Sequence, residues 1–329
     1  MFLDSARHIV DLGKQSLWLT LVQLAPFILG FVMHRLIGPL DTYSAFGLLD
    51  KIAFAAILGG TGLMQALFFF AGDGIGRKDI DAYQSSMANG LFVSVLISFL
   101  LSLTIFFTGE ILIAIGVDES IYSMVKELSP YVAVLIIPSI LLSPLKIHLI
   151  LQNKSHLLSV LFSFGSIVGI IACMYLVETL NVSDYDMTKS ILLCVASVNA
   201  IVLIVSYFLG LNTSFPLPNL KGFLNRISRS KVVGLFALGW PISGVILIEN
   251  FAILLSLLII GRYWPEVLSI HTVVLLWISI GLLASLGISQ AIVQKVSVLW
   301  SEGQKIESRK YCIAATILTF MFSGNIFNL

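Results

Sequence analysis

Long apolar segments alternate with short polar ones along almost the whole chain. Nine segments come close to the roughly 20 residues that a helix needs to cross a bilayer. These predicted transmembrane helices cover residues 16–37, 48–72, 87–109, 121–150, 157–177, 190–210, 232–261, 267–294 and 311–329. Residues 1–15 place apolar side chains at helical intervals among charged ones, which predicts a short amphipathic helix on the membrane surface. The pattern therefore indicates an all-α polytopic membrane protein.

Composition excludes a soluble domain. Of the 329 residues, 58% are apolar and 11% are charged, against about 25% charged in an ordinary soluble domain. Lipid must therefore cover much of the surface, and the net charge of +1 gives no sign of a nucleic-acid partner. The sequence contains no phosphate-binding Gly-Lys-Ser/Thr loop and no arguable catalytic triad. We expect a protein that binds no ATP, needs no cofactor and is not an enzyme.

Lysine and arginine are distributed unevenly between alternate loops. With a cytoplasmic N-terminus, 14 basic residues lie in inside segments and 5 in outside segments, as the positive-inside rule requires. The chain is thus predicted to be a multi-pass protein of the inner (plasma) membrane. The most polar interruption, residues 212–231, carries two prolines and four basic residues. It is interpreted as a cytoplasmic linker between a six-helix first lobe, 1–211, and a partial second lobe, 232–329.

The two halves share a repeated pattern. Gly62, Gln65 and Ala66 near the end of the second segment correspond to Gly287, Gln290 and Ala291 near the end of the eighth. Leu-Ile-Gly at 36–38 and Ile-Ile-Gly at 259–261 likewise end the first and seventh segments. Six spans separate the matching segments, so the repeats have the same orientation. Gly62 and Gly287 are predicted to allow close helix packing, and Gln65 and Gln290 to form interhelical hydrogen bonds.

At these residues the sequence resembles the multidrug and toxic-compound extrusion (MATE) family of secondary transporters. The strongest match contains Leu238-Gly239-Trp240-Pro241, Glu249, Gly261-Arg262, His271, Gly287, Gln290-Ala291, Lys295 and Gly303. The first half matches more loosely through Gly30-Phe31-Val32, Gly38, Gly62, Gln65-Ala66 and 74–76. The resemblance implies two pseudo-repeat helical lobes, of which this chain holds about nine of twelve helices. We therefore expect a C-terminally truncated second lobe.

Four polar residues are candidates for coupling transport to an ion. Glu249 is the only carboxylate well inside an apolar segment, where a charge is costly and is expected to face a cavity, bind sodium or be protonated. Asn250 beside it offers a neutral oxygen. Many family members carry an aspartate near the end of helix one, but here Met33 and His34 follow the Gly-Phe-Val triplet, so the first-lobe carboxylate is expected to be missing. His34 is a candidate cavity residue, and Asp50 is interpreted as half of a surface pair with Lys51.

Three functions remain open from the sequence. The first is a sodium- or proton-coupled antiporter that exports small organic, amphipathic or cationic compounds by alternating access. The second is a flippase of the same superfamily for a lipid-linked precursor, which the scarcity of intramembrane cations disfavours. The third is a degenerate, truncated membrane protein that does not transport.

Overall fold

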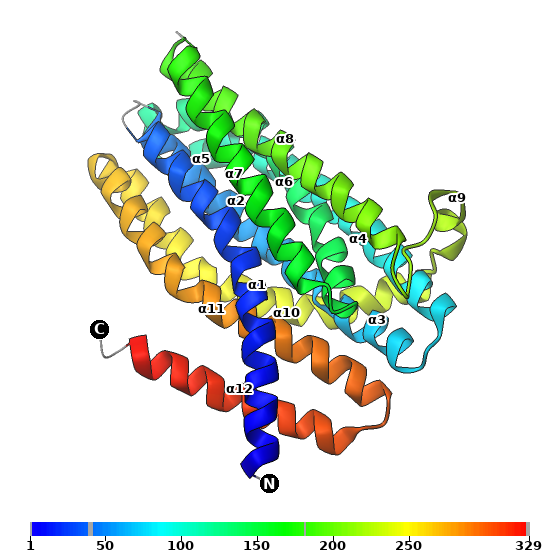
Figure 1. Cartoon of the computed structure of the whole chain (residues 1–329). Coiled ribbons are helices and arrows are strands. Elements are labelled where there is room, and N and C mark those ends of the chain that lie inside the picture. The colour runs from blue at the N-terminus through cyan, green and yellow to red at the C-terminus, as the bar shows by residue number, and fades with distance from the viewer. Residues whose placement is uncertain (1, 39–41, 181, 327–329) are drawn as a thin grey trace.

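The computed structural model describes residues 2–38, 42–180 and 182–326, and over these residues the chain forms helices and no strand (Figure 1). The helices are α1 (Phe2–Ile37), α2 (Tyr43–Met64), α3 (Ala66–Gly76), α4 (Ile80–Phe106), α5 (Thr108–Ile115), α6 (Glu119–Leu151), α7 (Ser155–Thr179), α8 (Asp184–Leu211), α9 (Leu220–Phe223), α10 (Arg229–Tyr263), α11 (Leu268–Ser301) and α12 (Lys305–Ile326). Short 3₁₀ turns lie at Leu224–Arg226 and Pro265–Val267. Helices occupy nearly all described residues of the nine predicted segments, the last three residues of the ninth lying outside the described chain, and the all-α membrane fold is confirmed.

Seven stretches of the described chain are long and apolar enough to cross a membrane. They are Arg7–Ile37, Tyr43–Gly76, Ile80–Phe106, Glu119–Leu151, Ser155–Thr179, Asp184–Leu211 and Arg229–Tyr263. The second stretch combines α2 and α3, which meet at Gln65. The short helix α5 was not predicted from the sequence.

The prediction of a separate amphipathic helix at residues 1–15 is wrong. Residues 2–15 form the first turns of α1, which continues without a break to Ile37, and residue 1 lies outside the described chain. No proline lies before Pro26, so nothing in the sequence ends the helix between its polar and apolar parts. The N-terminal part of α1 consequently extends past the neighbouring helices, where α12 crosses it (Figure 1).

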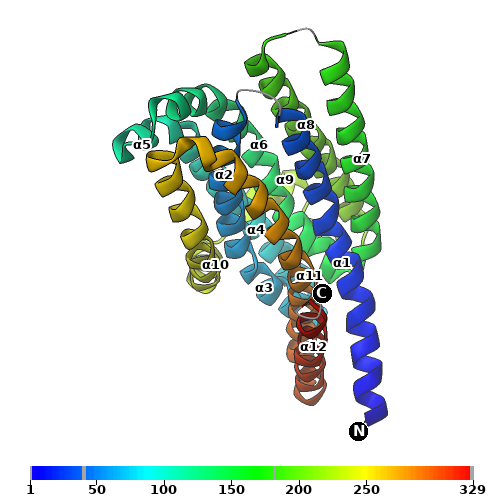
Figure 2. The same ribbon diagram turned by 90° about the vertical axis from the view of Figure 1, so that its left-hand side faces the viewer.

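Helix α1 lies between the two sides of the bundle. It packs against α7 on one side and against α11 on the other, while α10 packs along α2 (Figure 2). Helix α6 contacts α4, α8 and α2, and it fills the middle of the first half. Buried apolar side chains form two clusters, one around Phe46 and Ile136 and the other around Met64 and Tyr83.

Glycine contacts between the halves follow the sequence repeat. A Cβ placed on Gly62 of α2 would lie 3.2 Å from the Cα of Ser243 on α10, and one on Gly287 of α11 would lie 2.9 Å from the backbone nitrogen of Thr20 on α1. Thr20 and Ser243 are separated by 223 positions, the same separation as between Gly38 and Gly261. The α2–α10 and α11–α1 contacts are therefore equivalent under the repeat, which supports the pseudo-repeat architecture.

Candidate functional site

Three ionisable side chains meet where α1 and α2 approach each other. The Nε2 atom of His34 lies 3.2 Å from Oδ2 of Asp50, and the Nζ atom of Lys51 lies 3.4 Å from the same oxygen. His34 and Lys51 are buried, at 6% and 8% exposure, whereas the Asp50 side chain is 36% exposed. The ring of Phe46 lies 4.9 Å from that of His34, and the ring of Tyr43 lies 5.8 Å away. We call His34, Asp50 and Lys51 the first-half triad.

One expectation changes at the first-half triad. Asp50 and Lys51 are not a surface pair, because Lys51 is buried and Asp50 also bonds to His34 on another helix. Asp50 places a carboxylate from α2 beside His34, while Met33 of α1 stands where many family members carry an aspartate. The Nδ1 atom of His34 is buried and has no hydrogen-bond partner among the described residues.

Glu249 lies apart from the first-half triad, on an exposed face of α10. Within the described residues no hydrogen bond or ion pair involves it, and only 11% of the most apolar stretch of α10 is buried. Asn250 donates to the carbonyl oxygen of Ile246 in its own helix, at 2.8 Å. No group of three or more His, Cys, Asp or Glu side chains in the described chain could hold a metal ion. Sodium binding at Glu249 stays a prediction.

The repeat residues lie between helices of different halves. Gly62 and Gly287 are at the α2–α10 and α1–α11 contacts described above. Gln290 on α11 accepts a hydrogen bond from Nε2 of Gln23 on α1, at 3.3 Å. Gln65 occupies the junction between α2 and α3. Gly62, Gly287 and Gln290 therefore lie at contacts between helices, and the interhelical hydrogen bond of Gln65 stays a prediction.

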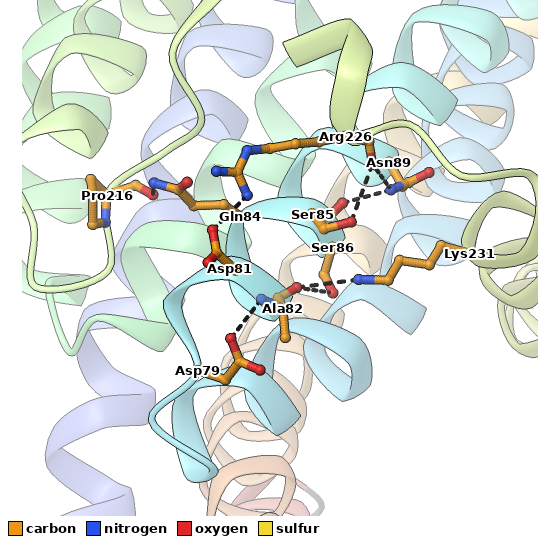
Figure 3. Close-up of polar contacts among 10 residues, drawn as sticks. All are labelled: Asp79, Asp81, Ala82, Gln84, Ser85, Ser86, Asn89, Pro216, Arg226 and Lys231. Carbon is orange, nitrogen blue, oxygen red and sulfur yellow. Dashed lines mark hydrogen bonds and ion pairs between the residues drawn. The ribbon is translucent and has the colours of Figure 1, made fainter. Parts of the chain in front are cut away.

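Sequence reasoning missed a polar site on α4. It holds residues 212–228, the part of the predicted linker that precedes α10 and that is called the linker from here on. Asn89 is fully buried, and its Nδ2 donates to the carbonyl oxygen of Arg226 at 3.0 Å while its Oδ1 accepts from the backbone nitrogen of Ser228 at 2.8 Å. Ser85 donates to the same Arg226 carbonyl at 3.1 Å, and Gln84 donates to the carbonyl oxygen of Pro216 at 3.2 Å (Figure 3). The linker is therefore bound to the first half just before α10 begins.

A second set of contacts holds the start of the linker. The hydroxyl of Tyr83 lies 2.6 Å from Nδ1 of His148, and both side chains are fully buried. Thr213 lies 3.4 Å from Nε2 of the same histidine, and the ring of Phe215 packs 5.4 Å from that of Tyr83. The signal in the sequence that could have indicated these contacts was the presence of Asn89, Tyr83 and His148 among largely apolar residues. Their partners are far away in the sequence, so periodicity did not reveal them.

Cavities in the described part of the chain include two that lie away from the first-half triad. One, of about 540 Å³, lies between α11 and α12 and is lined by small and hydroxyl-bearing residues such as Ser289 and Thr316. The other, of about 200 Å³, is polar and lies among α1, the α6–α7 turn and α11. Neither cavity contains Glu249 or His34.

Comparison with known proteins agrees with this architecture. The MatE family model matches residues 17–175. The eukaryotic MATE transporter AtDTX14 is similar in structure, with a TM-score of 0.83 at 18% identity over 96% of this chain and 70% of that one. A MOP superfamily transporter from Pyrococcus furiosus, described as having a binding pocket of reverse polarity, gives 0.82 at 14% identity over 97% and 71%. An outward-facing multidrug resistance MATE family transporter gives 0.81 at 14% identity over 97% and 71%. No curated protein matches the chain in sequence.

The predicted resemblance is confirmed by two separate findings. The family model matches the first half, where the family motifs are weaker than in the second half. The structural match extends through the second half as well. Together they support a multi-pass membrane protein. Residues 17–175 therefore match the MatE family model, in a chain that has the fold of MATE transporters over nearly its whole length.

Proposed function

We propose that the chain is a cation-coupled antiporter that exports small amphipathic or cationic organic compounds by alternating access. The first lobe (1–211) and the second lobe (232–329) move relative to each other about their α1–α11 and α2–α10 contacts. The protein lies in the inner membrane with its N-terminus in the cytoplasm. The observation that carries the proposal is the first-half triad, which places a titratable imidazole against a carboxylate between two helices.

The triad can exchange one positive charge for another. Asp50 and Lys51 together are neutral, so a proton on His34 makes the group positive. Unit charges about 3–4 Å apart interact by roughly 4–5 kcal/mol at an effective dielectric constant of 20. A protonated His34 therefore competes strongly with a cationic compound for the Asp50 carboxylate, and it repels that compound when it is nearby. Histidine is the side chain whose charge ordinarily changes between about pH 5 and 8, so proton release and cation binding can be linked here.

Glu249 is proposed as a second coupling group on α10. A carboxylate this far inside an apolar helix costs a few kcal/mol if charged and unpaired. Protonation, a sodium ion or a cationic compound would each remove that cost. Because Glu249 and the first-half triad lie in different halves, each can act separately on the lobe to which it belongs.

Transport by the purified chain in proteoliposomes tests the proposal. A fluorescent organic cation is followed under an imposed proton gradient and, separately, a sodium gradient. We expect Asp50→Asn and Glu249→Gln to lose gradient-driven transport, while exchange of labelled for unlabelled compound without a gradient persists. His271→Gln is the matched control, because the hydrogen bond of the His271 ring in the described part of the chain is to Ser256 on α10, at 3.1 Å.

The outcomes separate the alternatives. Full gradient-driven transport by both variants would refute the coupling role of these carboxylates. Movement of a lipid-linked diphosphate without any organic-cation transport would favour the flippase. A correctly inserted protein that transports neither would favour a chain with a structural role.

A further inference from the structure

The 200 Å³ polar cavity has the chemistry of an anion site. Its wall includes Lys14 on α1, His156 in the first turn of α7 and Lys295 on α11. Lys295 is paired with Asp11, 3.0 Å away, and Asp11 also accepts from the hydroxyl of Tyr311 at 2.8 Å. The one carboxylate at the cavity is thus neutralised by contacts already made. Lys14 and His156 have no acidic partner among the described residues.

The backbone adds to the positive character of this cavity. Helix α7 is 25 residues long, and its N-terminal end, at Ser155, lies in the cavity wall. The N-terminus of a long helix carries a partial positive charge and free N–H groups that favour anions. Here the preceding residue, Lys154, makes no side-chain cap. Ser155 is 5% exposed, and its hydroxyl has no hydrogen-bond partner among the described residues.

Size and position narrow the class of ligand. Pockets that hold drug-sized compounds measure roughly 300–1,000 Å³, so this cavity suits a phosphate group and not a whole transported compound. Trp18 lines it and is 41% exposed, as is common for tryptophan at the level of lipid headgroups. The cavity lies at the end of the molecule that the positive-inside rule places in the cytoplasm. Basic pockets between helices on that side bind anionic headgroups.

We propose that this cavity binds a phosphate group, supplied by an anionic phospholipid headgroup or by free phosphate. The walls come from α1 and α7 of the first half and from α11 of the second. A bound phosphate contacts both halves at once and therefore stabilises the arrangement in which α1 and α11 are adjacent. This inference does not depend on the proposed transport activity, because binding is measured without it.

Native mass spectrometry and thermal unfolding of the full purified chain test the site. The probes are phosphatidylglycerol, phosphatidylcholine and inorganic phosphate. We expect wild type to retain phosphatidylglycerol over phosphatidylcholine, and Lys14→Gln to weaken this binding about fivefold, as expected for one basic residue near an anionic headgroup. The Lys14→Gln, His156→Gln double variant should lose more. Both positions are exposed, so neither change threatens folding.

Lys305→Gln is the matched control, because Lys305 is an exposed lysine near the same end of the molecule and lies outside the cavity. Stabilisation by phosphatidylglycerol but not by inorganic phosphate identifies a lipid headgroup, and the reverse identifies free phosphate; either result supports the site. Equal binding of phosphatidylglycerol and phosphatidylcholine by wild type, with no effect of phosphate, would overturn it. Equal loss of binding in Lys305→Gln and Lys14→Gln would overturn it as well.

Discussion

The close contact between α10 and α2 predicts opposite effects of alanine substitution at two glycines of α10. Gly239 is buried, and a Cβ there would lie 3.1 Å from both the C and Cα atoms of Leu63 and closer still to its carbonyl oxygen. These are backbone atoms of α2, so they cannot move without shifting the helix. Gly244, five residues further along α10, has nothing within 4 Å of the same position.

Alanine should therefore destabilise the protein at Gly239 and stabilise it at Gly244. Either alanine gains about 0.5–1 kcal/mol from lower backbone entropy in the unfolded chain, and this gain cancels when the two variants are compared. Overpacking a tight contact costs about 1–3 kcal/mol, which is the expected difference between them. Unfolding in mixed micelles with increasing denaturing detergent, followed by tryptophan fluorescence, measures this difference. Equal stability of the two variants would show that the halves do not meet closely at Gly239.

Two further predictions concern polar contacts of the linker and of α12. Asn89→Leu removes both hydrogen bonds to the linker and should cost about 1–3 kcal/mol. Trypsin should therefore cleave after Arg226 faster in this variant. The control is the same change at Asn199, which bonds to another helix far from the linker and should leave that cleavage rate unchanged. Hydrogen bonds from Lys310 and from His8 hold the pKa of Glu307 below its ordinary value of 4.5. The stability that this carboxylate adds is therefore present at neutral pH and is lost as the pH falls through the lowered pKa. Hydrogen exchange in the first turns of α12 should rise on such acidification, and an identical rise in Glu307→Gln would contradict this.

The helices and the repeat could be predicted from the sequence because both depend on local or regular patterns. Hydropathy located all nine apolar segments, and the spacing of Gly62 and Gly287 identified equivalent helices. The same spacing did not show that each glycine faces the opposite half. That result depends on how α10 and α11 pack against α2 and α1, which a pattern along one helix does not contain.

The first-half triad could be predicted only in part. His34 and Asp50 were both candidates, but their contact depends on the path of the chain between α1 and α2. The contacts of Asn89 were missed because their partners lie 137 and 139 positions away. The continuity of α1 was missed for another reason: amphipathic spacing describes which face of a helix is polar and does not say where the helix ends.

The docking of the linker on α4 has a practical consequence for measuring motion. A spectroscopic label on an exposed linker residue such as Asn225 reports the position of the first half, although the residue is close in sequence to α10. Paired with a second label on the exposed Trp300 position at the end of α11, it forms a distance ruler across the two halves. Two labels placed across the contact between the linker and α4, one at Asn225 and one on α4, should keep a constant separation throughout the proposed motion of the lobes.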